Sequence, residues 1–147
     1  MPQAAANEGR EECLFKAQLR LLHETAQFIA AFCHRHGIGM PDALRITLVV
    51  EELFTNTVEH GYHGDSEALI RVVLERDGDE VALLYEDRAP AYDPLSRLAA
   101  AAEPEATRGS RPVGGLGMLL VTHLAHAARY AHEDGCNRLW LKLPYAR

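Results

Sequence analysis

Residues 51–62 read Glu51-Glu52-Leu53-Phe54-Thr55-Asn56-Thr57-Val58-Glu59-His60-Gly61-Tyr62, a largely apolar helical pattern that also carries a row of polar side chains. Residues four positions apart share one face of a helix, so Glu52, Asn56 and His60 are predicted to lie in a row. Glutamate can accept a proton, and the side-chain oxygen of asparagine can bind a hard cation such as Mg²⁺. The row is therefore a candidate functional site, and a polar stripe on a surface helix is the alternative interpretation.

The sequence before this stretch predicts one strand and two helices. Alternation with a period of two favours a strand over residues 13–19, and helical spacing of apolar residues favours a helix over about 21–36. Pro41 is suited to the first turn of a second helix, which is predicted to run to about His60. Residues 1–10 are small and polar, and they are predicted to form a flexible N-terminal segment.

The sequence after this stretch predicts two hairpins separated by helices. Apolar alternation over residues 70–74 and 81–85, with Asp77-Gly78 between them, is typical of a β-hairpin. The other predicted elements are a short helix over 95–102, a helix over about 115–127 and strands over about 128–132 and 137–143, which are joined through Asp134-Gly135. The order β-α-α-β-β-(α)-α-β-β predicts an α+β fold, a two-layer sandwich of a mostly antiparallel sheet with helices on one face.

Size and composition place the chain in an ordinary globular class. The length of 147 residues predicts one domain over residues 11–147, and no apolar run has the length of a membrane span. The formal net charge of −6, without a basic cluster, argues against direct nucleic-acid binding. Three scattered cysteines and the lack of a signal-peptide pattern favour a reduced, cytoplasmic protein.

A second candidate motif follows the first predicted hairpin and reads Glu86-Asp87-Arg88-Ala89-Pro90-Ala91-Tyr92-Asp93-Pro94. Asp87 is predicted to lie where an inner strand runs into a loop. A carboxylate at that point can accept a hydrogen bond from an exocyclic amine such as that of adenine. The alternative is that Asp87 only organises the turn, as aspartate often does.

A third candidate motif precedes the predicted helix over 115–127 and reads Val113-Gly114-Gly115-Leu116-Gly117-Met118. Glycine lets the backbone approach a ligand closely, and the free N–H groups at a helix start favour an anion such as phosphate. Neither the Rossmann nor the P-loop pattern is present. A flexible connector is the alternative interpretation.

In this order and spacing, the three motifs resemble the N, G1 and G2 boxes of the GHKL ATP-binding superfamily, which includes gyrase, a heat-shock chaperone, histidine kinases and MutL. Within it, the chain is most similar to bacterial anti-sigma-factor serine kinases of the RsbW and SpoIIAB type. The narrower resemblance rests on Glu-x-x-x-Asn-x-x-x-His-Gly-Tyr, Asp-Pro, Gly-Gly-Leu-Gly and a closing Gly-x-Asn-x-Leu-x-Leu from Gly135. It covers roughly residues 11–145.

The resemblance implies a role for each motif. Glu52 would be the general base, Asn56 would hold Mg²⁺, and Asp87 would bind the adenine amino group. An ATP lid would span about residues 95–113. Further nucleotide contacts are implied for His60, Ala89, Tyr92, Arg108, Arg111, Gly114, Gly115, Leu116, Gly117 and Met118.

The function implied by the resemblance is that of an anti-sigma factor and protein serine/threonine kinase. It would bind ATP and Mg²⁺, sequester a sigma factor, and phosphorylate an anti-anti-sigma protein with a STAS domain. A homodimer is implied, with the first strand and first helix as candidate contacts. The alternative is a nucleotide-binding or partner-sequestering module without kinase activity.

A metal centre built from histidines is a further alternative. His34 and His36 lie two positions apart, and His123 and His126 lie three apart. These pairs fall on separate predicted elements and lack the cysteine or carboxylate spacing of a zinc site. Zinc in the purified protein would favour this alternative.

One residue departs from the family pattern. The Asp loop of the family usually carries glycine two residues after the aspartate, where this chain has Ala89. Alanine adds a methyl group and, if its φ is positive, costs roughly 1 kcal/mol. The sequence therefore predicts weakened nucleotide binding, which Ala89→Gly would restore.

Overall fold

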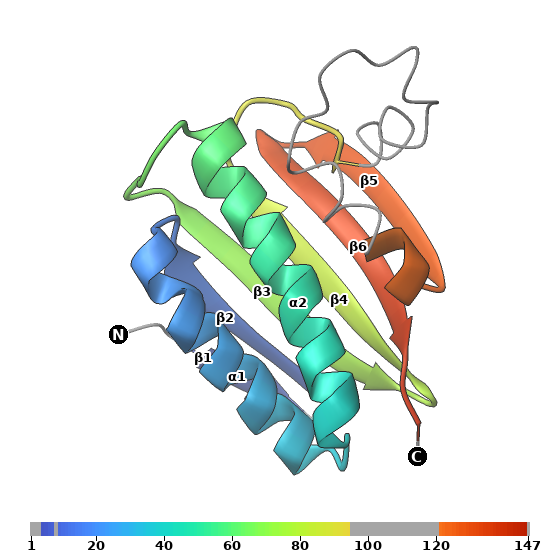
Figure 1. Cartoon of the computed structure of the whole chain (residues 1–147). Coiled ribbons are helices and arrows are strands. Elements are labelled where there is room, and N and C mark those ends of the chain that lie inside the picture. The colour runs from blue at the N-terminus through green and yellow to red at the C-terminus, as the bar shows by residue number, and fades with distance from the viewer. Residues whose placement is uncertain (1–3, 8, 95–120, 147) are drawn as a thin grey trace, which may run out of the picture.

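The computed structural model describes residues 4–7, 9–94 and 121–146. Within these ranges, six strands form one antiparallel sheet in the order β1-β2-β3-β4-β6-β5. Helices α1 and α2 cover one face of the sheet, and the other face carries no helix among the described residues (Figure 1). This arrangement confirms the predicted two-layer α+β fold.

The elements lie close to their predicted positions. The strands are β1 (Ala4–Asn7), β2 (Arg10–Lys16), β3 (Leu69–Asp77), β4 (Glu80–Asp87), β5 (Ala127–Glu133) and β6 (Cys136–Pro144). The helices are α1 (Leu22–Arg35) and α2 (Met40–Asn56), with a 3₁₀ turn η1 (Leu19–Leu21) and a π turn η2 (Thr57–Gly61). No helix in these described ranges has the length and apolar character needed to cross a membrane.

The second helix is built as the sequence indicates. Gly39 precedes α2, and Pro41 lies in its first turn, where a missing N–H costs nothing. The apolar side chains that face inward recur at helical spacing, and they are Ala43, Ile46, Val49, Val50, Leu53 and Phe54. Phe54 is fully buried and meets the ring of Phe15 on β2 edge-on at 6.5 Å. Each of these buried side chains larger than alanine contributes about 1.5–3 kcal/mol, and together they fix α2 on the sheet.

The first strands differ from the prediction. The sheet begins with β1, inside a segment predicted to lack regular structure, and β2 begins at Arg10 rather than Cys13. The cause is Glu11, which faces inward with only 4% of its surface exposed. Arg35 binds its carboxylate, and His36 Nε2 lies 3.0 Å from its Oε2. A buried carboxylate interrupts the apolar alternation from which the start of the strand was predicted.

Both predicted hairpin turns are confirmed. Gly78 has φ +60°, and Asp134 and Gly135 have φ +53° and +74°, as a tight two-residue turn requires. The predicted helix over 115–127 ends earlier than expected, because residues 121–124 are helical and Ala127 already begins β5. The start of that helix and the predicted helix over 95–102 lie outside the described residues.

The sheet order brings two distant segments together at the site. Strand β6 lies between β4 and β5 and pairs antiparallel with both. In the β4–β6 register, Asp87 lies directly opposite Asn137. Side chains on directly opposed residues lie close enough to interact. The end of β4 therefore receives a polar partner from a strand that is fifty residues away in sequence.

Candidate functional site

The end of α2 brings together two of the three residues in the predicted polar row. Asn56 is the last residue of α2 and is 4% exposed. Its Nδ2 donates a hydrogen bond to Oε1 of Glu52 at 3.4 Å. Glu52 is partly exposed, one turn earlier on the helix. The base candidate and the metal-ligand candidate are therefore neighbours.

The third member of the row, His60, follows a change in helix geometry. After Asn56 the chain forms the π turn η2, in which the Tyr62 N–H donates to the Thr57 carbonyl oxygen, five residues back, at 3.0 Å. A π turn is wider than an α-turn, so the positions that follow no longer share the face of Asn56. His60 lies exposed on η2, outside the set of described residues that line the cavity below.

Asp87 ends β4 and is held from three directions. Its Oδ2 accepts a hydrogen bond from Thr57 Oγ1 at 2.8 Å. Its Oδ1 accepts from Asn137 Nδ2 at 2.8 Å and from the Ala89 N–H at 3.1 Å. The side chain is only 7% exposed, and these three donors replace the hydrogen bonds to water that burial removes. Asp87 thus organises its turn, as the alternative interpretation holds, and it also faces a cavity.

Thr57 connects Asp87 to a buried phenol. Tyr85 Oη lies 2.7 Å from Thr57 Oγ1. Burial and the nearby charge of Asp87 raise the pKa of Tyr85 well above its ordinary value, so its hydroxyl keeps its proton at neutral pH. Tyr85 then donates a hydrogen bond to Thr57, and the Thr57 hydroxyl donates one to the Asp87 carboxylate. The Leu53 carbonyl oxygen also lies 3.0 Å from this hydroxyl, but a carboxylate is the stronger acceptor.

Asn137 is a site residue that the sequence analysis used only as part of a closing motif. Besides Asp87, its Nδ2 lies 3.0 Å from the Ala89 carbonyl oxygen and 3.1 Å from that of Pro90. Its Oδ1 accepts the Tyr92 N–H at 3.1 Å and the hydroxyl of Tyr130. The signal for Asn137 in the sequence is that it alternates in phase with Leu139, Leu141 and Leu143 and so shares their face of the strand. Its partner Asp87 could not be read from this pattern, because it depends on strand order.

These residues line one cavity between the end of α2 and the sheet. It is small and partly open to solvent, with a cavity volume of about 30 Å³. Asn56, Thr57, Asp87 and Asn137 supply its uncharged and acidic polar groups. The rest of its described lining is mainly apolar or aromatic and consists of Leu53, Tyr85, Tyr92, Pro94, Tyr130, Arg138 and Leu139. The cavity therefore joins an acceptor carboxylate to apolar and aromatic walls.

The predicted strain at Ala89 does not apply. The described non-glycine residues with positive φ are His63 and Asp134, and Ala89 is not among them. The methyl of Ala89 is buried, at 3% exposure, and is absent from the described cavity lining. The backbone cost on which the prediction of weakened binding partly rested is therefore removed.

The remaining predicted site residues lie outside the described part of the chain. They belong to the glycine motif and the predicted lid, and they are Arg108, Arg111, Gly114, Gly115, Leu116, Gly117 and Met118.

A comparison with known protein families agrees with the fold. A profile described as the histidine kinase-like ATPase domain matches residues 15–143. A search of curated protein sequences gave no significant match.

Two solved structures have a similar fold. The structure of the RsbU and RsbW domains of Rv1364c from Mycobacterium tuberculosis aligns with a TM-score of 0.62 and 20% identity over 92% of this chain. The match spans 33% of that longer chain. The SiaB–SiaC complex from Pseudomonas aeruginosa aligns with a TM-score of 0.56 and 16% identity, over 88% of each chain. At sequence identities this low, the similarity shows a shared fold.

Proposed function

Because the chain belongs to the histidine kinase-like ATPase domain family, we propose that it binds ATP and Mg²⁺ and phosphorylates a serine or threonine of a protein partner. In this proposal it is a cytoplasmic anti-sigma factor that sequesters a sigma factor and phosphorylates a STAS-domain anti-anti-sigma protein. The observation that carries the proposal is that Asn56 and Asp87, from separate motifs, line one cavity.

The chemistry of the cavity fits a magnesium-bound adenine nucleotide. Asp87 presents a carboxylate that can accept from an exocyclic amine, between aromatic and aliphatic walls. Asn56 uses its Nδ2 toward Glu52, so its side-chain oxygen is the atom suited to a hard cation. An amide oxygen and a nearby carboxylate are typical of magnesium sites, in which the metal also contacts the phosphates.

Three side chains would take part in the transfer. ATP would supply the phosphoryl group and leave as ADP, while Mg²⁺ would offset the charge on the phosphates. Glu52 would accept the proton of the attacking hydroxyl, held beside Asn56 by the 3.4 Å contact. Asn56 would hold the metal, and Asp87 would orient the adenine ring through its amino group.

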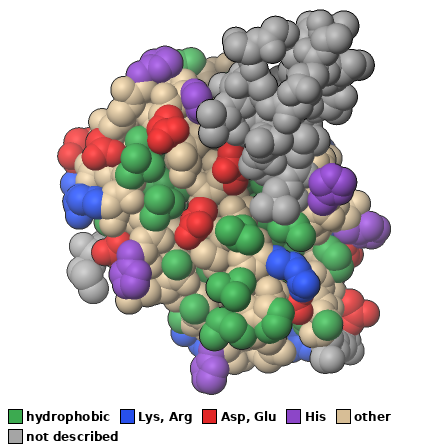
Figure 2. Space-filling model, in the orientation of Figure 1, with side chains coloured by type: hydrophobic (Ala, Val, Ile, Leu, Met, Phe, Trp, Pro, Cys, Tyr) green, Lys and Arg blue, Asp and Glu red, His purple; other side chains and the backbone are tan. Residues whose placement is uncertain are grey.

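Exposed apolar side chains support a protein as the partner. Met40, Leu44 and Leu48 are 68%, 57% and 46% exposed, and at a spacing of four they form a row on α2 that continues to Glu52. Hydrophobic side chains gather on this helix-covered face (Figure 2). Docking beside η2 would bring a partner hydroxyl to Glu52. A homodimer through β2 and α1 belongs to the same proposal.

The first test is a calorimetric titration of ATP with and without Mg²⁺. Asn56→Ala is expected to lose the magnesium-dependent part of the affinity, because it removes the proposed metal ligand. Glu52→Gln is expected to bind ATP normally, since it keeps the hydrogen bond to Asn56. Glu59→Gln, an exposed carboxylate on η2, is the matched control. If ATP binding by the Asn56→Ala variant responds to Mg²⁺ as strongly as binding by wild type does, the metal assignment is contradicted.

The second test separates a kinase from a binding module. Labelled ATP is incubated with the protein and a purified STAS-domain partner, and phosphate on the partner is counted. Transfer by the wild type and by Glu59→Gln, but at least about a hundredfold slower transfer by Glu52→Gln, is expected for a general base. Binding of ATP and partner without any transfer would instead identify a sequestering module.

A further inference from the structure

Turn η2 and the loop after β4 touch at a point where one residue lacks a side chain and the other has only a methyl group. A Cβ added to Gly61 would lie 2.9 Å from Cβ of Ala89 and 3.9 Å from Cγ2 of Thr57. Carbon atoms do not approach within 3.0 Å without displacement of one of them. The methyl of Ala89 therefore occupies the space that a side chain at Gly61 would need.

Backbone conformation does not require glycine at either position. Neither Gly61 nor Ala89 is among the described residues with positive φ. Alanine is therefore allowed at residue 61 as far as the backbone is concerned, and glycine is not needed at residue 89. The space between the two backbones holds only one methyl group. This limit, rather than backbone strain, accounts for glycine at residue 61 and alanine at residue 89.

Both sides of this contact are connected to Asp87. On the loop side, the Ala89 N–H donates to Asp87 Oδ1, and the Ala89 carbonyl oxygen accepts from Asn137. On the helix side, Thr57 begins the π turn that ends at Gly61, and its hydroxyl donates to Asp87 Oδ2. A displacement of either segment would therefore move a donor that fixes the carboxylate.

We infer that Ala89 and Gly61 form a reciprocal pair that sets the distance between the loop and η2 and so aims Asp87 into the cavity. The pair is a positioning device for the recognition of an amino-substituted purine, and this inference rests on the proposed function. It reverses the expectation from the sequence, because the methyl at Ala89 now supports the site instead of obstructing it. Ala89→Gly should then weaken the binding of ATP.

The test compares wild type with Gly61→Ala, Ala89→Gly and the double variant that exchanges the two residues. Each protein is titrated with ATP and with inosine triphosphate, which carries oxygen in place of the exocyclic amine. The wild type should prefer ATP by about tenfold or more, the effect of one hydrogen bond to a charged group. Each single variant should lose most of this preference, and the exchange should regain at least half of it on a logarithmic scale.

The preference between the two nucleotides is decisive, because general destabilisation lowers both affinities alike. Gly39→Ala is the matched control, since φ is −69° there and the nearest atom to an added Cβ is 3.8 Å away. It should leave the preference unchanged. Urea unfolding of the four proteins without nucleotide gives an independent readout, in which the two substitutions should compensate each other rather than add.

The outcomes separate this inference from the proposed function. A wild type that prefers ATP, with single variants that keep the same preference, overturns the positioning role and leaves ATP binding intact. A double variant that is no better than the worse single variant in both readouts also overturns it. A folded wild type that binds neither nucleotide overturns the proposed function, and this inference with it.

Discussion

At the scale of single residues, Thr57 is the link between the helix layer and the sheet at the site. It follows Asn56 directly, so the residue after the proposed metal ligand contacts the proposed base-recognition residue. Its hydroxyl lies 2.7 Å from Tyr85 Oη and 2.8 Å from Asp87 Oδ2. One hydroxyl thus serves a buried donor and a buried acceptor at once.

Replacement of this hydroxyl should cost stability. Thr57→Val keeps the shape of the side chain but takes a hydrogen-bond partner from both Tyr85 and Asp87, so we expect a loss of about 2 kcal/mol in the free energy of unfolding. Urea denaturation monitored by circular dichroism measures it. Thr57→Ser, which keeps the hydroxyl, should retain most of the stability. A valine variant as stable as wild type would show that the hydrogen-bond chain contributes nothing.

At the scale of elements, a buried carboxylate joins the start of β2 to the end of α1. Arg35 and His36 bind Glu11, and the ring of His36 also packs against Phe32, with centroids 4.4 Å apart. The hydrogen bond from Arg35 is the largest influence on the pKa of Glu11 and lowers it, followed by burial, which opposes the shift, and by His36, which adds to it. The contact thus favours the charged carboxylate.

This contact should make stability depend on pH in a defined direction. The pKa of Glu11 is lower in the folded protein than its ordinary value of 4.5, so the stabilisation is complete above that pH. It should be lost as pH falls from there through the folded pKa. Glu11→Gln should therefore be less stable than wild type by about 1 kcal/mol at pH 7, a value reduced for the exposure of Arg35.

Unfolding of wild type and Glu11→Gln in urea from pH 7 to pH 3 measures this dependence. The difference between the two proteins should shrink below about pH 4.5, while Glu59→Gln should track wild type throughout. A difference that stays constant over the whole range would refute the role of the Glu11 charge.

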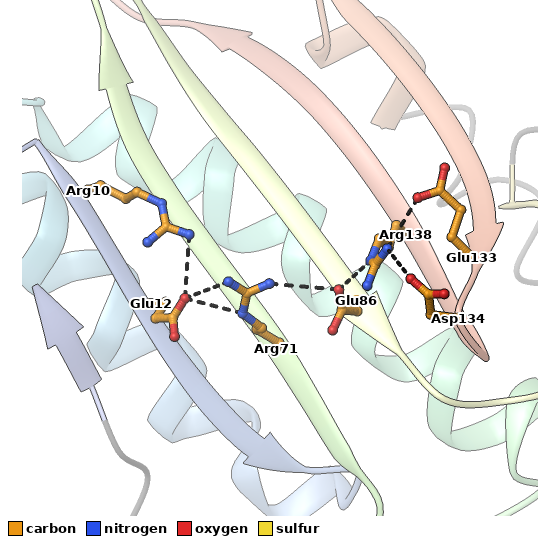
Figure 3. A network of polar contacts seen from close by, with 7 residues as sticks. All are labelled: Arg10, Glu12, Arg71, Glu86, Glu133, Asp134 and Arg138. Carbon is orange, nitrogen blue, oxygen red and sulfur yellow. Dashed lines mark hydrogen bonds and ion pairs between the residues drawn. The ribbon is translucent and has the colours of Figure 1, made fainter. Parts of the chain in front are cut away.

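At the scale of the whole molecule, a ladder of charges crosses the sheet face opposite the helices (Figure 3). Arg71 lies 2.7 Å from Glu12 and 3.7 Å from Glu86, and Arg138 lies 2.7 Å from Glu86. The ladder thereby connects the strands β2, β3, β4 and β6, which are neighbours in that order across the sheet. Its members are Arg10, Glu12, Arg71, Glu86, Arg138, Glu133 and Asp134.

The centre of the ladder should be sensitive to salt. Glu86 contacts two arginines, so Glu86→Gln should lower the free energy of unfolding by about 1 kcal/mol at low ionic strength. In 1 M NaCl, where screening acts over roughly 3 Å, most of that difference should disappear. Glu75→Gln, an exposed carboxylate on β3, is the control. Equal differences at low and high salt would indicate a packing effect in place of an electrostatic one.

The family and the layered fold were predictable because their signals are local. Helical spacing located α1 and α2 to within a few residues, and Asp77-Gly78 and Asp134-Gly135 located two turns that the backbone angles confirm. The match to the histidine kinase-like ATPase domain confirms the predicted superfamily. One boundary was wrong for a physical reason, because the buried Glu11 concealed the start of β2. The predicted end of the second helix near His60 agrees with the structure, in which the last turn, Thr57–Gly61, is a π turn.

By itself, the sequence determined most of the segments that form helices and strands and the polar residues that are candidates for the site, because periodicity and turn chemistry act over a few neighbouring residues. Only the tertiary structure decided that Asn137 meets Asp87 and that Ala89 fits against Gly61. Those contacts depend on strand order and on distances between backbones far apart in the chain, and no local pattern encodes them.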